Sequence, residues 1–194
     1  MNPRHRILAA TAAFAIAFLA SYPVAQSRRA DLATGSFAQS SNPGAAVLIG
    51  PIAYFASDDG IHGRELWRSD GTPSGTWLVA DILPGSAGSQ PDRLTVLGTT
   101  LVFAASDLNN GREVWRSDGS AAGTRLVADL TPGVASTSFW GSATSFTVFG
   151  GAVLFAASDG VTNVELWRSD GTLGGTSLVR DIMSGPNGSY PAEI

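Results

Sequence analysis

The 194-residue sequence contains no cysteine and no lysine. Without cysteine, the chain has no disulfides, no thiolate zinc or iron–sulfur site and no thiol nucleophile. All 12 basic residues are arginine, set against 16 acidic residues, and the net charge of -4 lacks the basic footprint of a nucleic-acid binder. Charged residues make up only 14% and hydrophobic residues 44%, so a folded core is expected rather than a disordered chain.

The N-terminal segment has the order of an export signal. A charged start at 4–6 precedes an apolar run over 7–20, and the small residue Ala25 marks a cleavage point. The run of 14 residues is shorter than the roughly 20 that span a bilayer. A cleaved signal peptide over 1–25 is therefore favoured over a retained anchor or an ordinary buried helix. We expect a secreted or cell-surface protein without a membrane span in the mature chain.

The rest of the chain repeats itself after a stretch at 26–44 that is rich in Ser, Ala and Gly and predicts a flexible leader. The octad Glu65–Thr72 recurs as Glu113–Ser120 and as Glu165–Thr172, at offsets of 48 and 52 residues. A preceding Phe and the following Gly-Thr, Leu-Val and Asp recur in step. Four extra residues near Ser136 to Ser142 account for the longer interval.

Three units are therefore predicted, at about 45–90, 91–142 and 143–194. Each contains four short runs of β-branched and aromatic residues separated by turn residues, which indicates strands. In the second unit the runs are 93–97, 101–105, 112–117 and 124–130. Four strands at this period are typical of a β-propeller blade rather than a helical solenoid. The predicted fold is all-β, with four-stranded antiparallel blades.

Three units are fewer than the roughly 4 to 8 blades of a closed propeller. Residues 185–194 align with 85–94 at an offset of 100, where a fourth unit would begin its first strand. We therefore expect an incomplete propeller. A piece of a longer repeat protein is favoured over one closed by another copy or another chain, because unpaired sheet edges are a liability.

The three octads resemble the bacterial ELWxxDGT repeat family, which is also labelled hyalin-like. The resemblance covers about 150 residues, 42–194, and its departures are Val114, Ser120 and Leu130. It implies an exported protein with propeller-type repeats. It brings no catalytic residues with it.

Threefold recurrence favours structural roles, because a catalytic site needs one copy of each group converging on one pocket. The residues given structural roles are Glu65, Trp67, Asp70, Asp81, Glu113, Trp115, Asp118, Asp129, Glu165, Trp167, Asp170 and Asp181. The recurring tryptophans are expected to fill the space between sheets, the alternative being a platform for sugar. Trp77 and Trp140 do not recur, and they are the candidate ligand-binding residues.

The Asp-Gly turns could offer oxygens to calcium. Calcium takes 6 to 8 oxygen ligands, however, and the loops lack the acidic spacing of an EF-hand or a calcium-loaded β-roll. An Asp side chain that bonds its own turn is favoured, so no metal site and no cofactor are expected. His62, the one histidine beyond the signal, is expected to be a solvated turn residue rather than a catalytic one.

The composition and repeats together predict a binding or structural module outside the cytoplasm, with a protein or glycan ligand and no enzymatic activity. The alternative is a secreted hydrolase of glycans or acidic polymers, since a pair of carboxylates could serve such a reaction.

The pairing of the third and fourth strands of each unit depends on the length of their turn. A five-residue turn would place Glu65 opposite Asp81, where like charges destabilise an antiparallel pair. A four-residue turn over 71–74 instead places Arg64 opposite Asp81. It also sets Trp67 beside the apolar Leu78, and we expect this register.

The same register would pair Arg112 with Asp129 in the second unit. We expect Asp81 and Asp129 to be structural partners of arginine or of backbone N–H groups, and not a catalytic pair. In the third unit Val164 replaces the arginine, so Asp181 would need Arg168 or Arg180 instead.

The exported protein is expected to begin near Gln26, because the charged start, apolar run and small-residue end form one signal peptide. Intact-mass measurement of the exported material checks this. A mass that includes Met1 would contradict it.

Overall fold

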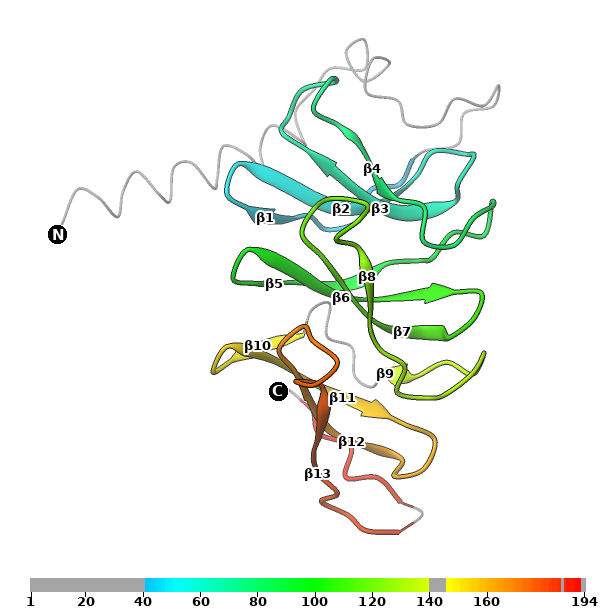
Figure 1. The fold of residues 1–194 in the computed structure, drawn as a ribbon, viewed down its shortest axis with the longest axis vertical. Helices are drawn as coiled ribbons and strands as arrows, with labels where there is room; N and C mark the ends of the chain where they lie inside the picture. The colour runs from blue at the N-terminus through cyan, green and yellow to red at the C-terminus, as the bar shows by residue number, and fades with distance from the viewer. Residues whose placement is uncertain (1–40, 140–145, 186, 193–194) are drawn as a thin grey trace, which may run out of the picture.

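The computed structural model describes residues 41–139, 146–185 and 187–192, which form antiparallel β-sheets without a helix. The all-β prediction is confirmed, with four strands running in chain order in each of three sheets. Figure 1 shows these sheets one above another in the order of the chain. The first sheet contains β1 (Val47–Ile49), β2 (Ile52–Asp58), β3 (Arg64–Ser69) and β4 (Trp77–Ala80).

The other two sheets repeat this meander. The second contains β5 (Asp92–Leu97), β6 (Thr100–Asp107), β7 (Gly111–Ser117) and β8 (Arg125–Ala128). The third contains β10 (Thr147–Phe149), β11 (Ala152–Ser158), β12 (Val164–Ser169) and β13 (Ser177–Arg180). The predicted insertion supplies β9 (Ser138–Phe139), which pairs with β11. Trp140, the proposed signal peptide and the leader up to residue 40 lie outside the described residues.

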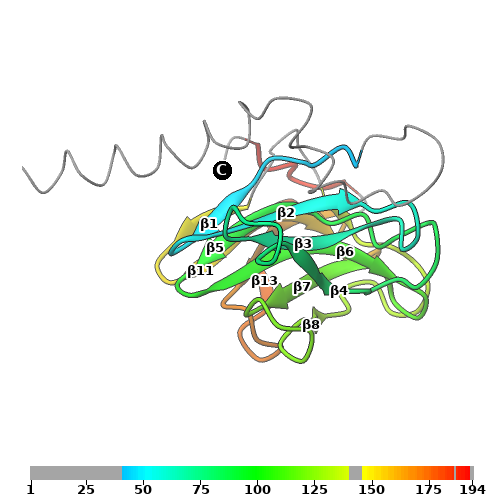
Figure 2. The same cartoon turned by 90° about the horizontal axis from the view of Figure 1, so that it is seen from above.

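The core lies between the sheets, and the middle sheet contributes to both core clusters. Figure 1 shows this sheet between the other two, and Figure 2 shows the same sheets from above. The side chains of successive β6 residues point to opposite faces of the sheet, as the two-residue period of a strand requires. Leu101 and Phe103 pack toward the first sheet. Val102 and Ala104 pack toward the third sheet. All four are fully buried.

Paired aromatic residues fill each junction between sheets. Phe103 pairs with Trp115 across two strands of the second sheet, and both join the cluster shared with the first sheet. Phe155 and Trp167 pair in the same way and join the cluster shared with the second sheet. Trp115 and Trp167 therefore lie between sheets, where their large rings contribute apolar area.

A β-bulge changes the register of the last strand in each sheet. Trp67 pairs with Leu78, so the four-residue turn is confirmed, but the register shifts before Leu66, which pairs with Ala80. The extra residue on β4 is Val79. Beyond the bulge, Asp81 no longer lies opposite Arg64. The predicted Arg64–Asp81 pair is therefore wrong.

The predicted ion pair between Arg112 and Asp129 is also wrong. Arg112 instead pairs with Asp92 and donates to the Gln90 carbonyl. Asp129 accepts the Gly133 N–H at 3.4 Å, so the expectation of a backbone donor holds for this residue. Its other oxygen is buried without a hydrogen-bond partner, as is one oxygen of Asp181.

The segment that leads from one sheet to the next is held by a buried glutamate. Glu65, at the start of β3, has no exposed surface. Its Oε1 accepts the N–H groups of Leu83 (3.0 Å) and Ser89 (2.8 Å), and its Oε2 accepts the Ser89 hydroxyl. Burial raises the pKa of Glu65, while these hydrogen bonds oppose the rise. One carboxylate thus fixes both ends of the connection.

The same contact, which we call the glutamate clamp, recurs in all three units. Glu113 accepts hydrogen bonds from Leu130 and from the N–H and hydroxyl of Thr137. Glu165 accepts them from Ile182 and from the N–H and hydroxyl of Ser189. The hydroxyl residue lies 24 positions after the glutamate each time. The clamp is therefore a property of the repeat.

Replacing the clamp glutamate with alanine is expected to destabilise the fold. Glu113→Ala leaves buried N–H groups of the connection without an acceptor, and each such loss costs about 1–3 kcal/mol. We expect a loss of about 3 kcal/mol or more in the free energy of unfolding, measured with urea. The control Leu108→Ala, at a residue 70% exposed, should stay within about 0.5 kcal/mol. Equal effects of the two substitutions would contradict the clamp.

Candidate functional site

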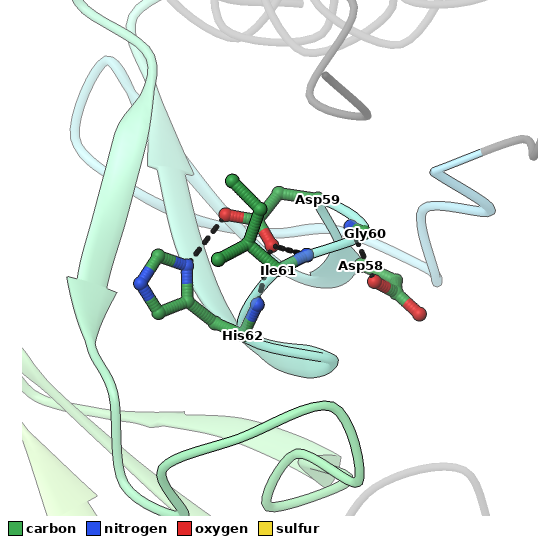
Figure 3. Close-up of polar contacts among 5 residues, drawn as sticks. All are labelled: Asp58, Asp59, Gly60, Ile61 and His62. Carbon is green, nitrogen blue, oxygen red and sulfur yellow. Dashed lines mark hydrogen bonds and ion pairs between the residues drawn. The ribbon is translucent and has the colours of Figure 1, made fainter. Parts of the chain in front are cut away.

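The turn between β2 and β3 joins a carboxylate to the single described histidine (Figure 3). Asp59 Oδ1 accepts the N–H groups of Ile61 (2.9 Å) and His62 (2.8 Å). Its Oδ2 lies 2.7 Å from Nδ1 of His62. Asp59 is buried, while the His62 side chain remains 36% exposed. Sequence reasoning missed this pair and treated His62 as a solvated turn residue.

The two groups shift each other's pKa. The hydrogen bond that the His62 ring donates to the Asp59 carboxylate raises the pKa of His62. Burial raises the pKa of Asp59, but the hydrogen bonds from His62 and Ile61 outweigh it and lower the pKa overall. The pair therefore holds a proton on His62 to a higher pH than a free histidine would.

The other two units build the same turn without a histidine. Asp107 accepts the Asn110 N–H on one oxygen and the Asn110 amide on the other. Asp159 accepts the Thr162 N–H and hydroxyl. The sequence pattern that marks this turn in all three units is an Asp followed three residues later by a polar side chain. Because Asn and Thr serve equally, the turn needs a hydrogen-bond donor and not specifically a histidine.

The aspartate of the turn between β3 and β4 is hydrogen-bonded within its own turn. Asp70 Oδ1 accepts the N–H (2.9 Å) and the hydroxyl (2.7 Å) of Thr72. The hydrogen bond from the Thr72 hydroxyl lowers the pKa of Asp70. A Cβ atom at Gly75 would lie 1.8 Å from that oxygen, so a larger residue there would displace the carboxylate from its turn. Asp118 and Asp170 bond their own turns in the same way.

These turns do not assemble a cluster of metal ligands. Within 41–139, 146–185 and 187–192, no three His, Asp or Glu side chains gather closely enough to hold a metal ion. The oxygen Oδ1 of Asp70 is occupied by its own turn. The geometry of these aspartates is that of side chains that fix the backbone of their own turn.

The charge of one carboxylate affects the pKa of a buried one in the second unit. The pKa of Glu113 is raised by burial and, to a smaller extent, by the charge of Asp129. Glu113 has no exposed surface, and both of its oxygens accept hydrogen bonds from the connection. A polymer substrate has no route to this carboxyl.

The candidate ligand residue Trp77 lies on β4 and is 43% exposed. The guanidinium of Arg68 lies over its ring, 4.4 Å from the centroid. The same guanidinium lies 5.8 Å from the Tyr54 ring centroid. Trp77 is thus part of an aromatic and cationic row across the first sheet, and not an isolated surface ring.

Comparison with known proteins adds no relative. No protein-family model matches the sequence, and no curated protein or solved structure shows significant similarity to it. In the part of the chain that the structure describes, no helix is long and apolar enough to cross a membrane.

The pKa of His62 is expected to lie above the ordinary value of about 6.5, because Asp59 stabilises the charged ring. Its contribution to stability is complete below that value and is lost as the pH rises through the raised pKa. An NMR titration of the exported protein, in which His62 is the only histidine if the signal is removed, measures it. Asp59→Asn should bring the pKa back toward 6.5.

The matched control is Asp58→Asn in the same turn. Asp58 accepts the Gly60 N–H and makes no hydrogen bond or ion pair with His62, so the histidine titration should not change. A shift as large as that of Asp59→Asn would contradict the assignment.

Proposed function

We propose that the chain is an exported β-propeller-type repeat protein that acts as a binding or structural module at or beyond the cell surface. The observation that supports this best is the repeated junction between sheets. The first and second sheets share one core cluster and the second and third share another. The same kind of face is used each time, so the units are built to stack in series.

Each junction joins an aromatic face to an aliphatic face. The second sheet offers Phe103 and Trp115 to Leu66 and Val79 of the first sheet. The third sheet uses its equivalent aromatic pair against Val102, Val114 and Val127 of the second. This direction means that each sheet receives the aromatic face of the sheet that follows it.

The third sheet presents the receiving face without a partner among the described residues. Its equivalents of Val114 and Val127 are Leu166, which is partly exposed, and Val179, which is 47% exposed. In the second sheet the corresponding side chains are buried. We propose that a further repeat or another chain covers this face and extends the propeller.

The module is proposed to bind a protein or glycan rather than to catalyse a reaction. Glu113, whose pKa is raised by burial and by the charge of Asp129, has no exposed surface, and the His62 turn has counterparts without histidine. The alternative, a secreted hydrolase of glycans or acidic polymers, would need carboxylates other than these. Export is proposed from the signal-like segment at 1–25, and neither a cofactor nor a nucleic-acid partner is part of the proposal.

The open face is expected to make the exported chain associate when it is studied alone. Sedimentation should show assemblies larger than a monomer at micromolar concentration, since an exposed apolar sheet face favours contact. Val179→Glu should shift the distribution toward the monomer, while Leu108→Glu, on an exposed turn outside this face, should not. A monomeric profile with a single cooperative melt for the unmodified chain would contradict the proposed stacking.

The hydrolase alternative is tested separately with the same material. Reducing-end release from acidic and neutral polysaccharides measures turnover. Release that is lost when one carboxylate is changed, and kept when its counterparts in the other units are changed, would overturn the binding module.

A further inference from the structure

We propose that Arg68 and Trp77 form a binding site for an acidic polysaccharide, with a carboxylate or sulfate group on Arg68 and a sugar ring on Trp77. This inference rests on the proposed function as a binding module and adds a position and a class of ligand to it.

The site is built on directly paired residues of three neighbouring strands. Tyr54 pairs with Arg68 between β2 and β3, and Arg68 pairs with Trp77 between β3 and β4. The guanidinium lies over both rings. Such stacking on aromatic faces is typical of arginine and holds its planar group in one orientation. The buried Tyr54 forms the floor of the row, and Trp77 forms its exposed end.

The charge of Arg68 is not neutralised by the protein. Among the ion pairs of the described residues, none involves Arg68, and its Nε is buried without a hydrogen-bond partner. Its charge reaches Asp70 only as a minor influence on that residue's pKa. An arginine with no carboxylate partner in the described residues can pair with the planar fork of a carboxylate or sulfate, so the chemistry here favours an anion.

Trp77 supplies the part of the site that the fold does not require. The equivalent positions in the other sheets hold Arg125 and Ser177, although the arginine before them recurs as Arg116 and Arg168. Strands β8 and β13 form in the same register without the indole. The exposed ring of Trp77 is therefore available for contact with a flat apolar surface, such as the face of a sugar.

The overall charge of the protein makes a local site distinguishable from general attraction. With the signal removed, ten arginines stand against sixteen acidic residues, a net charge of -6. A polyanion is repelled by such a surface as a whole. Binding of an acidic polymer would therefore have to come from a particular cationic position.

Titration calorimetry of the exported protein tests the site with three probes: oligogalacturonate, which carries carboxylates, dextran sulfate, and neutral dextran. We expect one or both acidic probes to bind and neutral dextran not to bind. Trp77→Ser, which introduces the residue found at position 177, should weaken binding at least tenfold with an unchanged melting temperature. Arg68→Lys should also weaken it, because a lysine keeps the charge but loses the stacked fork.

The second sheet offers a gain-of-site control. Arg125→Trp places an indole beside Arg116, as in the first sheet, and should raise the stoichiometry for a short acidic oligosaccharide from one to two. Leu108→Ala should leave affinity and stoichiometry unchanged.

The outcomes separate this site from the wider proposal. Acidic binding that survives Trp77→Ser, or equal binding of neutral dextran, would overturn the site or its charge preference and leave a binding module in place. No binding of either acidic probe by the folded protein would overturn the ligand class. Reducing-end release from the probes would overturn the binding module itself.

Discussion

The arrangement of the sheets depends on the buried glutamate that begins each octad. A carboxylate without exposed surface would be costly if its lone pairs were unused. In the first unit, Glu65 accepts the N–H groups at both ends of the connection and the Ser89 hydroxyl. Gln90 then donates to the Arg64 carbonyl, and Ser106 of the next sheet donates to the Ser89 carbonyl. The clamp therefore sets where the following sheet begins.

Once the connection is fixed, the alternation of side chains decides which faces meet. The central sheet is apolar on both sides because consecutive residues of β6 point to opposite neighbours. The turn between the third and fourth strands completes each junction, since Gly119 approaches the Tyr54 hydroxyl so closely that a Cβ atom would lie 2.2 Å from it. In the third sheet the equivalent Gly171 faces Val102, where a Cβ atom would lie at an ordinary contact distance of 3.6 Å. The turn between the third and fourth strands of a sheet thus contacts the sheet that precedes it.

The sequence was sufficient to predict the all-β class, the four strands that follow in chain order in each sheet, and the turn length, because these follow from local residue types and from repetition. The bulge at Val79 was not predictable, since it shifts the register by one residue without any glycine or proline to mark it. The octad glutamates were assigned structural roles, but their acceptor function depends on a hydroxyl 24 residues away. The contact of His62 with Asp59 could have been predicted from the sequence, because the equivalent Asp107 also precedes a hydrogen-bonding side chain by three residues.

Repetition also distinguishes the residues that the fold requires in every unit from the positions that can differ in function between units. The octad glutamates, octad tryptophans and turn aspartates are the same in all three units, and these glutamates and tryptophans are buried, so a change in any of them alters a buried contact or a turn. The position of Trp77 differs among the units and is exposed in each: Trp77, Arg125 and Ser177. The strand pairing there is backbone-based and does not depend on the side chain. A surface that the fold leaves unconstrained, beside an arginine that the fold repeats, is where one unit can acquire a ligand that its neighbours do not bind.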